Sequence, residues 1–124
     1  MKITSFNPLI LTRDADAAIA LFEALGFEQQ HSITIDESGK DIKNVRMKDA
    51  NGFCVDIAKS PDVPQDITMI RINVDDFDEA YKWLQSKGFT NPVSSDHVVE
   101  TRTNRTACMI SPSGFAFSIC QHIK

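Results

Sequence analysis

The strongest constraint on this chain is that its two halves resemble each other at one fixed offset of 62 positions. Residues 16–27 read DAAIALFEALGF, and residues 78–89 read DEAYKWLQSKGF. Two further pairs of segments align at the same offset: NGFCVDIA with SGFAFSIC, and LILTRD with RINVDD. Because three separate segments share one offset without a gap, we interpret the chain as two copies of one supersecondary unit.

Each copy predicts the order strand, helix, strand, strand, strand. The first helix begins at Asp14 or Asp16 and ends at Gly26, and the second begins within 75–78 and ends at Gly88. Alternation and β-branched residues predict the strands: 3–12, 27–35, 42–48, 53–58, 68–74, 93–95, 98–101, 105–111 and 115–121. We expect a single domain over 1–124, with copies at 1–60 and 67–124 and a proline-containing linker at 61–66.

Composition excludes several classes of protein. The net charge of −4 argues against nucleic acid as a partner, because a phosphate-binding surface needs clustered Lys and Arg. The three cysteines have no C-x-x-C spacing, which argues against a disulfide framework or structural zinc. The first residues lack the pattern of a signal peptide, and no apolar run is long enough to cross a membrane. We therefore expect a cytoplasmic protein without a membrane partner.

The tandem βαβββ pattern resembles the vicinal oxygen chelate superfamily, which includes glyoxalase I, extradiol dioxygenases and bleomycin-resistance proteins. The segments that carry the resemblance are LFEALGF at 21–27 and SPSGFAFSI at 111–119. The resemblance implies an α+β fold in which two βαβββ units form a half-open barrel around a cavity. It also implies a homodimer. Enzymes of this superfamily usually bind a divalent metal there, with ligands on the first and last strands of each unit.

Carried over by position, this pattern falls on Asn7 and Asp56 in the first copy and on Met69 and Ser118 in the second. Only Asp56 is a good ligand for a divalent metal, since an amide is weak, a thioether is soft and a serine hydroxyl is poor. We therefore expect no metal and no other cofactor. In its missing ligands the chain is similar to bleomycin-resistance-type proteins, which bind an organic molecule without reacting with it.

Strand alternation places Arg71 and Asn73 on the predicted cavity face beside Met69. Arg71 either meets a carboxylate or phosphate of the ligand, or it pairs with Asp56 in a structural role. The leading hypothesis is a small-molecule binding protein, and its candidate residues are Asn7, Asp56, Met69, Arg71, Asn73 and Ser118.

Two other hypotheses stay open. One is a lyase, isomerase or dioxygenase with a non-standard site built on Asp56 and on His31, His97 or Glu100. A histidine beside an acidic residue has the chemistry of a general base. The other is an inert interaction domain whose cavity is filled by its own side chains. The sequence does not decide whether the protein turns over its ligand.

Overall fold

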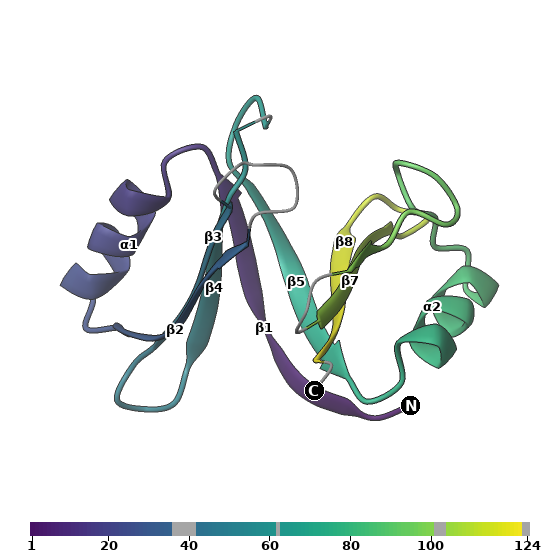
Figure 1. The fold of residues 1–124 in the computed structure, drawn as a ribbon, viewed down its shortest axis with the longest axis horizontal. Coiled ribbons are helices and arrows are strands. Elements are labelled where there is room, and N and C mark those ends of the chain that lie inside the picture. The colour runs from purple at the N-terminus through teal and green to yellow at the C-terminus, as the bar shows by residue number, and fades with distance from the viewer. Residues whose placement is uncertain (36–41, 62, 101–103, 123–124) are drawn as a thin grey trace. The chain divides into compact units, whose positions relative to one another are not determined.

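The computed structural model describes residues 1–35, 42–61, 63–100 and 104–122, which form an α+β fold (Figure 1). The elements in chain order are β1 (Ile3–Thr12), α1 (Ala15–Ala24), β2 (Glu28–Ile35), β3 (Ile42–Lys48), β4 (Cys54–Lys59), β5 (Ile67–Val74), α2 (Phe77–Ser86), β6 (Val99–Glu100), β7 (Asn104–Ile110) and β8 (Ala116–His122). The predicted α+β class is confirmed. Within the described residues, neither helix is long and apolar enough to cross a membrane.

The chain divides into two compact units. The first unit is Asn7–Thr68, and the second unit is Met69–Lys124 together with Met1–Phe6. The strand order is β2-β3-β4-β1 in the first unit and β5-β8-β7-β6 in the second. β1 is parallel to β4, and β5 is parallel to β8, while the other neighbouring pairs within each unit are antiparallel. The first strand thus contributes residues to both units.

The two units share one hydrogen-bonding register at the offset of 62. Leu9 pairs with Asp56 in the first unit, and in the second unit the residues 62 positions later, Arg71 and Ser118, pair in the same way. The pairing of β3 with β4 matches that of β7 with β8 at this offset, residue for residue. The bounds of α1 and α2 differ by the same number.

Matching residues also begin and end the two helices. The side chains of Asp14 and Asp76 each accept a hydrogen bond from the backbone N–H three residues later, at 3.0 and 3.1 Å. These bonds satisfy donors that the first turn of a helix leaves free. Gly26 and Gly88 follow the two helices with φ of 100° and 91°, which glycine adopts without steric strain. The predicted helix starts and stops are confirmed.

Each helix covers one face of its own unit's strands (Figure 1). The core of the first unit is apolar and lies under α1: Ala15, Ile19, Val45, Met47, Val55 and Ile57. The equivalent core of the second unit lies under α2: Ile72, Val74, Phe77, Ala80, Tyr81, Leu84, Ala107, Met109 and Ile119. Because side chains alternate along a strand, residues between these core positions lie on the face away from the helix.

One predicted strand, at 93–95, is wrong. The side chain of Asn91 accepts from the N–H of residue 93 at 3.0 Å and donates to the carbonyl of His97 at 2.7 Å. The hydroxyl of Tyr81 donates to the carbonyl of Ser95 at 2.7 Å. These side chains satisfy three polar backbone groups in and beside the segment, which folds as a loop.

Candidate functional site

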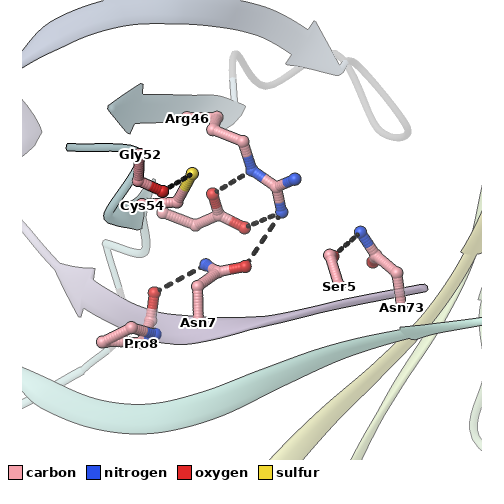
Figure 2. A network of polar contacts seen from close by, with 8 residues as sticks. Ser5, Asn7, Pro8, Arg46, Gly52, Cys54 and Asn73 are labelled. Atoms are coloured by element: carbon pink, nitrogen blue, oxygen red, sulfur yellow. Dashed lines mark hydrogen bonds and ion pairs between the residues drawn. The ribbon is translucent and has the colours of Figure 1, made fainter. Parts of the chain in front are cut away.

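A buried polar cluster joins three strands of the first unit (Figure 2). Nε of Arg46 donates to Oδ1 of Asp56 at 2.8 Å, and Nη2 donates to Oδ2 at 2.9 Å. Nη2 also donates to Oδ1 of Asn7 at 3.1 Å. Asn7 is oriented in turn by its own Nδ2, which donates to the carbonyl of Pro8 at 2.9 Å. The guanidinium therefore contacts both oxygens of the carboxylate and the oxygen of the amide.

The local sequence explains why Arg46 meets Asp56. Val45 and Met47 belong to the core under α1, so Arg46 between them lies on the opposite face. The β3–β4 register places Arg46 directly across from Asp56. Arg46 is not among the candidate residues predicted from the sequence. Strict alternation along 42–48, combined with the turn at 49–52, contains the signal that would have found it.

Burial makes this ion pair sensitive to change. The Asp56 side chain is 5% exposed, and that of Arg46 is 28% exposed. A buried ion pair adds little net stability over apolar side chains. Removing one partner leaves the other charge buried and unpaired, which lowers the free energy of unfolding by about 3–5 kcal/mol. The bidentate geometry is the arrangement in which Arg binds a carboxylate best.

The residues do not fit the divalent metal that the fold family implies. Asp56 supplies the one carboxylate of the cluster, and its two oxygens already accept from Arg46. The oxygen of Asn7 accepts from the same guanidinium. Within the described part of the chain, no three His, Cys, Asp or Glu side chains gather into a group that could hold a metal ion.

The remaining candidate residues lie in the second unit. Met69, Arg71 and Asn73 alternate along β5, on the face opposite the core residues of that strand. Ser118 lies on β8 and pairs in register with Arg71. Met69, Asn73 and Ser118 are buried and Arg71 is half-buried. The predicted sharing of one sheet face by these four residues agrees with the register.

The side-chain amide of Asn73 is only partly hydrogen-bonded among the described residues. Its Nδ2 donates to Oγ of Ser5 at 2.6 Å. Its Oδ1 is buried and has no hydrogen-bond partner among the described residues. A buried acceptor left without a donor costs about 1–3 kcal/mol. Asn73 is 4% exposed, so bulk water does not readily supply that donor.

The second unit replaces the polar cluster of the first with small or apolar side chains. At the shared register, the positions of Arg46, Asp56 and Asn7 are occupied by Cys108, Ser118 and Met69. Burial of the thiol raises the pKa of Cys108 above its ordinary value of 9.0. The thiol is therefore neutral at physiological pH, and none of the three replacement side chains carries a charge there.

The enzyme hypothesis combined Asp56 with His31, His97 or Glu100, and the structure describes the side chains of the last two. His97 is exposed in the loop that follows α2, and Glu100 forms an ion pair with Arg105 at 3.0 Å. Both belong to the second unit, whereas Asp56 belongs to the first. His31 is on β2, and its side chain lies outside the described side chains.

No family model and no curated protein sequence matches this chain. Solved structures do match. Methylmalonyl-CoA epimerase from Mycobacterium tuberculosis is 15% identical with a TM-score of 0.71, over 98% of this chain and 90% of that one. A glyoxalase/bleomycin resistance protein/dioxygenase superfamily member from Vibrio splendidus 12B01 is 17% identical with a TM-score of 0.56, over 97% and 99%. A glyoxalase I variant from Zea mays is 12% identical with a TM-score of 0.67, over 97% and 43%.

These likenesses, all at low identity, concern the fold. The chain shares the fold of these proteins, and the predicted resemblance to the fold of the vicinal oxygen chelate superfamily is confirmed. The activities in the names of those proteins belong to those proteins. What this chain does has to be argued from its own side chains.

Proposed function

We propose that this protein binds a small organic molecule without using a metal ion. The ligand lies against the sheet face of the second unit that carries Met69, Arg71, Asn73 and Ser118. The observation that supports this proposal is the buried Oδ1 of Asn73, which lacks a donor among the described residues. A ligand with an N–H or O–H group at that point would remove the cost of the unmet acceptor.

The neighbouring side chains suit an organic ligand of mixed character. Met69 offers an adaptable apolar surface, and Ser118 offers a hydroxyl that both donates and accepts. Arg71 is positively charged, and its planar fork suits a carboxylate or phosphate. In the first unit, Asn7 and Asp56 serve in this proposal to orient Arg46.

The fold comparisons give this proposal its probes. One similar structure is an epimerase of a CoA ester, and another belongs to a superfamily that is named in part for bleomycin resistance. Methylmalonyl-CoA and bleomycin are therefore the first probes. We also propose that the βαβββ unit was duplicated within the chain, because the two units share their register. A cytoplasmic location and a homodimer, which the sequence predicted, remain part of the proposal.

The test measures binding of both probes, and of a panel of small amides and alcohols, to metal-free protein by calorimetry. We expect at least one compound to bind, and Asn73→Leu to weaken it about tenfold or more through loss of one hydrogen bond. Asn44→Leu is the matched control, because Oδ1 of Asn44 is also buried without a partner among the described residues but lies in the first unit. Equal weakening in both variants, or none in Asn73→Leu, would contradict the proposal.

A further inference from the structure

We infer that Arg46 is a built-in substitute for a metal ion, because its guanidinium occupies the position between Asn7 and Asp56 that a divalent cation would need. This inference concerns the first unit and goes beyond the proposed ligand binding in the second. It does not depend on which ligand binds, or on whether any does. On this inference, both the Arg46 side chain and the missing ligands prevent a metal ion from binding.

The first observation that supports the inference is the hydrogen bonding of Arg46. Three N–H···O contacts of 2.8, 2.9 and 3.1 Å hold the guanidinium against both Asp56 oxygens and the Asn7 oxygen. A divalent cation would need the same oxygens at about 2.0–2.6 Å. The two cannot share those oxygens, so a metal ion would first have to displace the guanidinium (Figure 2).

The second observation that supports the inference is the charge balance at Asp56. Asp56 is almost completely buried, and a carboxylate in that position needs a positive partner. Arg46 supplies one positive charge and leaves the pair neutral. A divalent ion would neutralise the same carboxylate with charge to spare, which is what lets a bound metal polarise a substrate oxygen. The guanidinium provides the neutralisation without the Lewis acid.

The third observation comes from the second unit, whose sheet forms without such a cluster. Its strands have the same register, yet the equivalent positions hold Cys108, Ser118 and Met69. Where Ser118 replaces the buried carboxylate, Cys108 replaces the arginine on the neighbouring antiparallel strand. The guanidinium therefore accompanies Asp56 and is no requirement of the βαβββ scaffold.

The experiment replaces the guanidinium by a metal ligand. Arg46→His places an imidazole beside the freed oxygens of Asp56 and Asn7, which together form a donor set for Mn²⁺ or Ni²⁺. Binding of each ion to the chelator-stripped protein is measured by calorimetry. We expect Arg46→His to bind at least tenfold more tightly than the unmodified protein, and Arg46→His/Asp56→Asn to lose that gain.

Cys108→His is the matched control, because it adds a histidine at the equivalent position of the second unit, where no carboxylate lies opposite. Its affinity should equal that of the unmodified protein. Equal gains in Arg46→His and Cys108→His would overturn the inference, since the histidine alone would then explain binding. Unmodified protein that binds either ion and loses it in Asp56→Asn would overturn it too.

A second measurement covers the case in which Arg46→His does not fold. The Nε–H resonance of Arg46 is followed by NMR in unmodified protein as Mn²⁺ is added. We expect one equivalent of the paramagnetic ion to leave this signal sharp, because the guanidinium keeps the ion away from Asp56. Selective broadening of this signal at one equivalent would show that the ion binds beside Arg46 and would overturn the inference.

Discussion

The two units are built on the same backbone pattern and differ most clearly on one face of the sheet. Under the helices, apolar residues match: Val45 and Ile57 in the first unit correspond to Ala107 and Ile119 in the second. On the opposite face the first unit has the Arg46 cluster, and the second has the uncharged Cys108, Ser118 and Met69 at the equivalent positions. The core face and the helix ends match between the units, whereas the opposite face differs.

This difference distinguishes residues that stabilise the fold from residues that are candidates for function. A residue that both units share at the offset of 62 contributes to strand pairing, to a helix end or to the core. A polar residue that one unit has alone is a candidate for function, and Arg46, Asp56 and Asn73 meet that description. The comparison can be tested by changing equivalent positions in pairs.

The largest expected effect follows from removing the charge of Arg46. Arg46→Met leaves Asp56 buried and unpaired, and we expect a loss of about 2–4 kcal/mol in the free energy of unfolding, somewhat below a fully buried pair because Arg46 is 28% exposed. Urea denaturation of both proteins measures this loss.

Arg105→Met is the control for that prediction. Arg105 is an arginine of the second unit whose ion-pair partners, Asp78 and Glu100, are 69% and 62% exposed. Exposed ion pairs contribute about 0–1 kcal/mol, so this variant should lose about 1 kcal/mol or less. If Arg46→Met lowered the free energy of unfolding no more than Arg105→Met, the buried cluster would contribute no more to stability than an exposed ion pair.

The next largest effect distinguishes the two helix-ending glycines. Both have positive φ, so Gly26→Ala should cost about 1–2 kcal/mol in stability. Gly88→Ala should cost about 1 kcal/mol more, because a Cβ there would lie 2.9 Å from Cγ of Pro112, whereas one at Gly26 meets nothing within 4 Å. Chemical denaturation of the two variants tests the ranking, which the reverse order would refute.

A smaller and equal effect is expected at the helix starts. Asp14→Ala and Asp76→Ala each remove one capping hydrogen bond, and each should lower stability by about 1 kcal/mol. The two losses should agree within about 0.5 kcal/mol, because the caps are equivalent in geometry. Thermal unfolding of both variants measures them. A large inequality would show that one helix depends on its cap more than the shared geometry implies.

The smallest effect concerns pH and is confined to Cys108. Burial raises the pKa of its thiol, so the folded state favours the protonated form. The stability from this preference is complete below the unfolded pKa and is lost as pH rises through the folded value, above about pH 9. Stability of the unmodified protein should therefore fall more steeply than that of Cys108→Ala over that range. Parallel curves would contradict the prediction.

The regular elements could be predicted from the sequence because their signals are local. The bounds of β1 and β3 match the predicted 3–12 and 42–48, and the aspartates and glycines mark the helix ends. The loop over 93–95 could not be predicted in this way. It depends on Asn91 and Tyr81, which reach several residues along the chain to satisfy its backbone.

The candidate site was predicted only in part, for a related reason. The faces of β4 and β5 follow from alternation, which correctly placed Asp56, Arg71 and Asn73 away from the core. What each side chain contacts depends on the register between strands. The bond between Arg46 and Asp56 needed that register, and so did the unmet acceptor of Asn73.

The most direct test of the account is a double-mutant cycle on Arg46 and Asp56, followed by urea denaturation. The account predicts that Arg46→Met and Asp56→Asn are coupled by about 2 kcal/mol, within the range for residues in direct contact. The equivalent cycle of Cys108→Ala and Ser118→Ala should give a coupling near zero. Coupling below about 0.5 kcal/mol at Arg46 and Asp56 would contradict the claim that the Arg46 guanidinium is the positive partner of the buried Asp56 carboxylate.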